Sequence, residues 1–107
     1  MASKYENSSV DRVPAGGGSI RMTIASNVAQ GNGGTSLPCK RVWLIADKKE
    51  VRVTIGTACT ATTGIPLGYI DGSSYAGEYL MLEIADVSSL YFYCGSDGRN
   101  IDCLYRE

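Results

Sequence analysis

The chain has 107 residues, of which 44% are hydrophobic and 20% charged, and its formal net charge is −1. These values are typical of one soluble globular domain, and the balanced charge argues against a nucleic-acid partner. Histidine is absent, which removes the commonest general base and metal ligand and argues against an enzyme with a cofactor or a small-molecule substrate.

The first residues suggest an extended arm. Residues 1–18 are polar and end in three consecutive glycines, a composition typical of a flexible segment. They lack the apolar core of a secretory signal, and no apolar run in the chain approaches the roughly 18 residues of a membrane-spanning helix. We expect an N-terminal arm over 1–18, a domain over 19–107 and no membrane partner.

Strand patterns follow the arm. Ile20, Met22 and Ile24 alternate with polar residues, the period of a half-buried strand. Similar short patterns cover 39–46, 51–59, 78–84, 90–94 and 101–105. Glycine and proline interrupt the chain over 30–38 and 62–77. The segment 78–84 is helical by propensity, but Gly77 before it favours a strand. The pattern predicts an all-β fold, a small antiparallel β-sandwich of jelly-roll or immunoglobulin type.

The last two strands are predicted to form a hairpin. A turn centred on Gly98-Arg99 places Cys94 opposite Cys103. Because side chains on one face recur every second residue, one apolar face is expected to face the core. That face comprises Leu90, Phe92, Cys94, Ile101, Cys103 and Tyr105.

A second hairpin is predicted around the charged turn 47–50. A turn centred on Lys49 places Cys39 opposite Cys59. The same register sets Trp43 against Ile55 and Ile45 against Val53, which predicts that these four side chains share a core face.

The four cysteines have two interpretations. Cysteines opposite one another on antiparallel strands are close enough for disulfides, here Cys39–Cys59 and Cys94–Cys103. Alternatively, all four are buried thiols, which a reducing cytoplasm favours. A zinc site is disfavoured because the chain has no histidine and no CxxC pair.

The other face of the last hairpin is a candidate interface. Tyr91 and Tyr93 are predicted to lie on the same side as Leu104 and Arg106, a composition typical of protein interfaces. A sugar-binding surface has a similar composition. A further alternative is that a second sheet or the chain's own arm covers the tyrosines. No set of carboxylates or phosphate-binding loop suggests catalysis.

The stretch from Cys39 to Tyr105 resembles small β-sandwich virion proteins of tailed bacteriophages. Those proteins share a strand that ends in alanine, a polar turn, a strand that ends in IG, a GIPL element and a final I-x-D-x-S-x-LY strand pair. The matching segments are CKRVWLIADKKEVRVTIG, TTGIPL and LEIADVSSLYFYCGSDGRNIDCLY. The turn departs from the family, which usually has asparagine and glycine where this chain has DKKE.

The resemblance implies a non-enzymatic part of a virion: a capsid decoration protein, a head fibre base or a head–tail (neck) component. Such a protein is made in the host cytoplasm, and its partners are other virion proteins and further copies of itself in a homo-oligomer. The alternative function is a carbohydrate-binding module that uses exposed tyrosines or Trp43. The predicted core position of Trp43 argues against that use of its ring.

Overall fold

The computed structural model describes residues 17–25, 27–72, 74–95 and 98–107, with residues 74–76 described by their backbone alone. The described residues form ten strands and two short 3₁₀ helices. In chain order these are β1 (Gly17–Ile24), β2 (Val28–Gln30), η1 (Gly31–Gly34), β3 (Arg41–Ala46), β4 (Val51–Ile55), β5 (Ile65–Pro66), β6 (Tyr69–Asp71), β7 (Ser74–Ala76), β8 (Leu80–Leu82), η2 (Val87–Ser89), β9 (Leu90–Cys94) and β10 (Arg99–Arg106). The predicted all-β class is confirmed.

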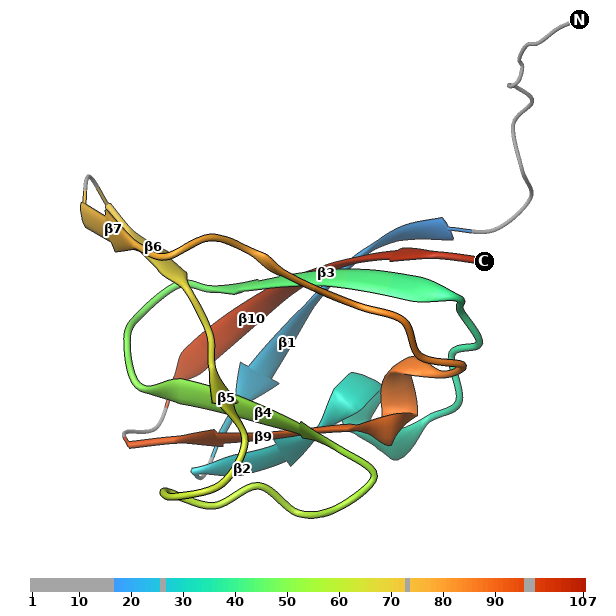
Figure 1. Ribbon diagram of the computed structural model, residues 1–107, viewed down its shortest axis with the longest axis horizontal. Helices are drawn as coiled ribbons and strands as arrows, with labels where there is room; N and C mark the ends of the chain where they lie inside the picture. The colour runs from blue at the N-terminus through green and yellow to red at the C-terminus, as the bar shows by residue number, and fades with distance from the viewer. Residues whose placement is uncertain (1–16, 26, 73, 96–97) are drawn as a thin grey trace, which may run out of the picture.

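The strands form two sheets that pack face to face. The six-stranded sheet has the order β1-β10-β3-β6-β7, and β8 also pairs with β3. The four-stranded sheet has the order β2-β9-β4-β5. Figure 1 shows the long strands β1, β10 and β3 in the upper part of the view, above β4, β9 and β2. All described pairings are antiparallel except the parallel contact between β3 and β6.

A single core fills the space between the sheets. Both sheets contribute fully buried side chains, among them Leu44 and Ile101 from one and Phe92 and Leu90 from the other. Buried residues alternate with half-buried ones along β9 and with exposed ones in the middle of β10, because each strand turns one apolar face inward. The predicted core face of these two strands is confirmed from Leu90 to Cys103, with Tyr105 half-buried against the core.

Both predicted hairpins are wrong. β9 pairs with β2 and β4, whereas β10 pairs with β1 and β3, so consecutive strands lie in different sheets. The same is true of β3 and β4. The two short connections cross from one sheet to the other. Alternation identifies the inward face of a strand, but it does not identify the strand beside it.

The predicted inner face of β3 is also wrong. Val42, Leu44 and Ala46 are buried, at 0–1% exposure, and Trp43 and Ile45 point to the outer side. Residues 42–46, VWLIA, are apolar on both faces, so their pattern does not distinguish the two faces. On β4, Val53 is buried as predicted, but Ile55 is 52% exposed at the strand's end.

Two further segments differ from their predictions. The glycine-rich break at 62–77 contains the short strands β5, β6 and β7, and β2 lies where no separate strand was predicted. Residues 1–16, most of the predicted arm, lie outside the described residues. Gly17 and Gly18 belong to β1, whose first residue pairs with Arg106 near the other end of the chain.

Candidate functional site: the outer face of the six-stranded sheet

The outer face of the six-stranded sheet carries exposed and half-exposed apolar side chains. Leu104 of β10, Trp43 of β3 and Met81 of β8 lie in one row across neighbouring strands. Ile45 follows Trp43 on the same face, and Tyr79 lies just before β8. Tyr79, Leu104 and Met81 are 61%, 51% and 44% exposed. We call these five side chains the platform.

A groove of about 610 Å³ runs along the platform. Its lining combines Trp43, Ile45 and Tyr79 with the charged pair of Arg21 and Asp102. Most of the lining is apolar. An aromatic wall beside a few charged groups is a composition found in protein-binding and sugar-binding surfaces.

Charged side chains flank the platform on both sides of the row, toward the two ends of its strands. Arg21 donates two hydrogen bonds to Asp102, from Nε to Oδ1 at 2.8 Å and from Nη2 to Oδ2 at 3.0 Å. At the other end, Arg41 pairs with Glu83 at 3.1 Å. Arg106 lies opposite Arg41 in the register of the sheet. These pairs are exposed, so they contribute little to folding but set the charge pattern of the face.

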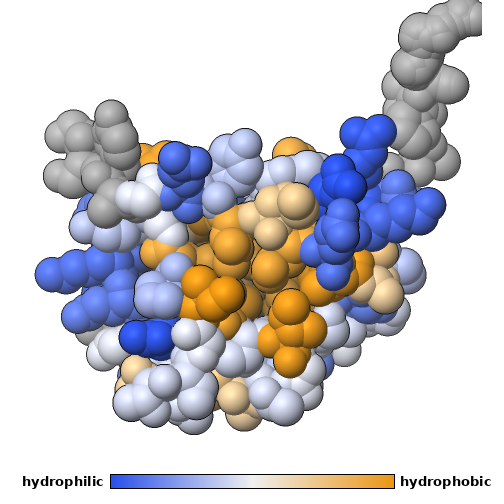
Figure 2. Space-filling model, in the orientation of Figure 1, coloured by the Kyte–Doolittle hydropathy of each residue, from blue (hydrophilic) through white to orange (hydrophobic). Residues whose placement is uncertain are grey.

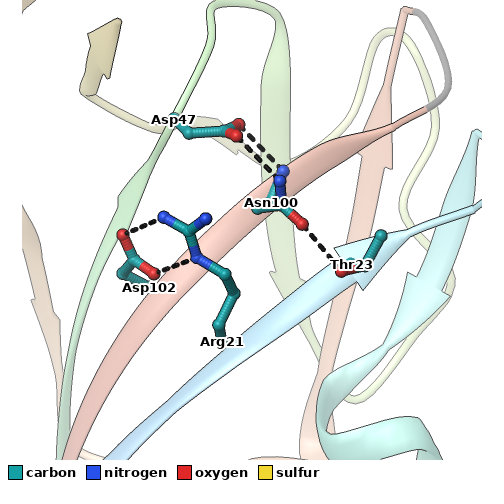
Figure 3. A network of polar contacts seen from close by, with 5 residues as sticks. All are labelled: Arg21, Thr23, Asp47, Asn100 and Asp102. Atoms are coloured by element: carbon teal, nitrogen blue, oxygen red, sulfur yellow. Dashed lines mark hydrogen bonds and ion pairs between the residues drawn. The ribbon is translucent and has the colours of Figure 1, made fainter. Parts of the chain in front are cut away.

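A polar network holds the Arg21 end of the face in place (Figure 3). Asn100 donates two hydrogen bonds to Asp47, from its backbone N–H at 2.9 Å and its Nδ2 at 2.8 Å. The Thr23 hydroxyl donates to Asn100 Oδ1 at 2.7 Å. Burial alone would raise the pKa of Asp47, but the bonds from Asn100 and two nearby positive charges outweigh burial and lower that pKa. The network therefore fixes β10 against both of its neighbours.

The four cysteines are buried reduced thiols without a disulfide. Cys94 lies in the four-stranded sheet and Cys103 in the six-stranded sheet, so the register that placed them opposite one another is wrong. Cys39 belongs to the main core, whereas Cys59 lies outside it on the β4–β5 connection. The structure therefore agrees with the second interpretation of the sequence, four buried thiols, and not with the two disulfides.

Three of these thiols are poorly suited to nucleophilic chemistry. Burial, together with the nearby Cys39, raises the pKa of Cys103 to about 12. Burial also raises the pKa of Cys39 and of Cys59. A cysteine nucleophile needs a lowered pKa, because the thiolate is the reactive form.

The predicted interface residues do not form one surface. Tyr91 and Tyr93 are half-buried on the outer face of the four-stranded sheet. Leu104 and Arg106 are exposed on the outer face of the six-stranded sheet. The prediction grouped them because it placed β9 and β10 in one hairpin. Leu104 is in the platform, Arg106 is at its border, and the two tyrosines are on the other side of the sandwich.

A second apolar surface lies at the edge between the sheets. A cleft of about 310 Å³ is lined by β4, β5 and β8, with Ile65 53% exposed beside it. Figure 2 shows apolar side chains gathered at the centre of the face on which these elements lie, with hydrophilic side chains on either side. The described residues that line this cleft include no aromatic ring. It is therefore a weaker candidate site than the platform.

Comparisons of the chain with protein-family models, curated proteins and solved structures find no match. The resemblance to phage virion proteins therefore rests on the sequence segments alone. Within the described ranges, no three or more His, Cys, Asp or Glu side chains are grouped to hold a metal ion. In the same part of the chain, no helix is long and apolar enough to cross a membrane.

Sequence reasoning missed most of the platform because it placed Trp43 and Ile45 in the core. The available signal was the absence of polar residues from both faces of VWLIA, residues 42–46. Such a strand is either buried on both sides or has an exposed apolar face that is available to bind a partner.

Proposed function

We propose that the chain is a non-catalytic structural subunit of a tailed-phage virion, a capsid decoration protein or a head–tail component. It binds neighbouring protein subunits through the platform, with residues 1–18 as a second contact. The observation that carries this proposal is the exposed apolar row Leu104–Trp43–Met81, flanked by charged pairs. A large aromatic residue among aliphatic ones, with a charged border, is typical of the centre of a protein interface.

Several features agree with a structural role. The fold is a small sandwich, burial raises the pKa of Cys39, Cys59 and Cys103, and the described residues contain no metal-binding cluster. Proteins that bind a symmetric shell also gain retention from many weak contacts, because each bound copy is held at several points. A platform of five side chains is sufficient for a contact of this kind.

The test is mass spectrometry of gradient-purified particles from the organism that encodes the chain. Leu104→Glu places a charge in the platform, and we expect incorporation to fall about tenfold or more, as for loss of a central interface residue. Val28→Glu is the matched control, because Val28 is an equally exposed strand residue, at 55% against 51%, in the other sheet. Absence of the wild-type chain from the particles, or equal incorporation of both variants, contradicts the proposal.

A carbohydrate-binding module is the second candidate, favoured by the position of Trp43 on the outer face of β3. Trp43 and Tyr79 line the groove together with charged groups, as in sugar-binding sites. Three aliphatic platform residues and the mutual pairing of Arg21 and Asp102 count against it, since sugars need polar partners. Saturable binding on a glycan array that Trp43→Ala abolishes and Leu104→Glu leaves intact would reverse the ranking.

A further inference from the structure

The outward side chains of β10 run from acidic to basic along the strand. This order is complementary to that of a second copy of β10 that runs in the opposite direction. The three consecutive outward residues of β10 are acidic Asp102, apolar Leu104 and basic Arg106. Asp102 already accepts two hydrogen bonds from Arg21. Arg106 has Arg41 and Gly17 as its register neighbours, and within the described part of the chain no carboxylate pairs with it. Among the described residues, Arg106 is thus an arginine without an acidic partner on this face.

The groove has the chemistry to accept an arginine side chain. Asp102 provides a carboxylate, and Trp43 and Tyr79 provide aromatic rings for the guanidinium. Ile45 provides apolar surface for the aliphatic stem. A carboxylate that already binds one arginine retains lone pairs for another, because it has about four acceptor positions.

We infer that the platform binds the platform of a second copy, about a two-fold axis that crosses the strands along the row Leu104–Trp43–Met81. This inference rests on the proposed function, in which the platform is a protein-binding surface. Such an axis reverses the strand direction and places β10 over its own copy. Arg106 of each copy then lies over Asp102 and the groove of the other, so two equivalent ion pairs form across one isologous interface.

The charges select this axis over the other two-fold arrangement. An axis parallel to the strands keeps the strand direction and exchanges the two ends of the row, so that Leu104 lies over Met81. Overlap of the whole row requires this axis to lie along β3. Arg106 then faces Glu83 of the copy, but Arg41 faces another Arg41, which places like charges together. With the crossing axis, Arg41 lies over Ile45 instead, and its own ion pair with Glu83 is undisturbed. The apolar row packs on itself in either case, so the charges decide.

Self-association is measured first on the full chain. Trp43 is the only tryptophan and lies at the centre of the platform, so its fluorescence reports burial of this face. We expect sedimentation to show a monomer–dimer equilibrium and the emission of Trp43 to shift to shorter wavelength as concentration rises from micromolar to millimolar. Leu104→Glu is expected to abolish both changes, and Val28→Glu to preserve them. A wild-type chain that stays monomeric with constant emission overturns the inference.

A charge exchange then tests the axis. Asp102→Lys and Arg106→Glu each place like charges over one another in a dimer of one variant, and each alone is expected to associate at least about tenfold more weakly. In an equimolar mixture, the introduced lysine of one variant faces the introduced glutamate of the other, and the unchanged Asp102 and Arg106 face each other. The mixture should therefore recover dimers, which sedimentation of a mass-labelled pair identifies as mixed. A mixture as monomeric as its components overturns the inference.

The two proposals fail in different ways. If the wild-type chain stays monomeric while Leu104→Glu still reduces incorporation into particles, the platform binds another protein and only the second copy is excluded. If the chain forms the predicted dimer but is absent from particles, the inference stands and the virion function is wrong. Matching far-ultraviolet spectra and unfolding transitions show that each variant has folded.

Discussion

The outer faces of the two sheets differ in how far other segments of the chain cover them. On the four-stranded sheet, the connection between β4 and β5 lies against the outer face: Cys59 is only 4% exposed, and it shares a small cleft with Tyr91. Arg52 on this face donates to the carbonyl of Gly64, 3.1 Å away, and so holds the end of the connection. The segment on this face is the β4–β5 connection, whereas the sequence alternative named a second sheet or the N-terminal arm as the cover of the tyrosines.

The six-stranded sheet has no comparable cover among the described residues. Its platform contains larger apolar side chains, yet Leu104 and Tyr79 remain more than half exposed. Burying apolar surface stabilises a protein by about 25 cal/mol per Å². The chain covers one outer face and leaves the more apolar face open, so burial of the open face can still stabilise association with a partner. The comparison supports the proposal that the uncovered face is the binding face.

The largest expected effect tests which side of β3 faces inward. Leu44→Ala removes a fully buried side chain and should lower the free energy of unfolding by about 2–5 kcal/mol. Ile45→Ala removes a side chain of the outer face and should cost less than half as much. Urea unfolding of the two variants measures the difference. Equal costs, or a larger cost at Ile45, would contradict the outward position of the platform.

Sequence reasoning succeeded where the alternation was strict and local. The inward faces of β9 and β10 were predictable because polar and tyrosine side chains separate the buried positions Phe92, Cys94 and Ile101. In β3, by contrast, Trp43 and Leu44 are both apolar, and the choice depends on which side meets the other sheet. The tertiary structure decides which face of β3 points inward, and the local sequence pattern does not predict it.

Strand pairing was the least predictable feature. The four residues 47–50 have the length and polarity of a hairpin turn, yet they lead from β3 in one sheet to β4 in the other. The partners of β10 lie far away in the sequence, at Arg21 and Trp43 for example. The platform assembles through these distant pairings. For this reason Leu104 was the only platform residue among the predicted interface residues.

A smaller effect is expected where the covering connection rejoins the four-stranded sheet. Gly64 has φ +87°, and a Cβ there would lie 2.5 Å from the carbonyl oxygen of Val53. Gly64→Ala should therefore cost about 1–3 kcal/mol and loosen the connection, so that Cys59 reacts faster with a thiol reagent. Mass spectrometry after a short pulse of reagent measures the labelling of Cys59.

Gly56→Ala is the matched control for this loosening. Gly56 has a similar φ of +81°, but its Cβ would meet open space. Only the backbone strain, about 1–2 kcal/mol, should remain, and Cys59 should stay protected. If the two variants label Cys59 equally, the connection is not held against the sheet at Gly64, and the contrast between the two outer faces weakens.

The smallest expected effect concerns the link between the two sheets. Asp86 precedes η2, which leads from β8 in one sheet to β9 in the other. Its carboxylate accepts hydrogen bonds from the backbone N–H of Leu37 and of Ser88, both at 2.8 Å, and from the Ser36 hydroxyl at 2.5 Å. These bonds, the one from Leu37 first, hold the pKa of Asp86 well below its ordinary value.

The sign of the pH dependence follows from this lowered pKa. The ionised carboxylate stabilises the folded chain fully above the ordinary aspartate pKa of about 4, and the stabilisation is lost as pH falls toward the lower folded value. Asp86→Asn keeps the shape but does not titrate. Its deficit in unfolding free energy relative to the wild type should be largest near neutral pH and should shrink progressively below about pH 4. Urea unfolding between pH 7 and pH 2 measures this, and a deficit that is constant with pH would show that the ionised carboxylate does not secure the link.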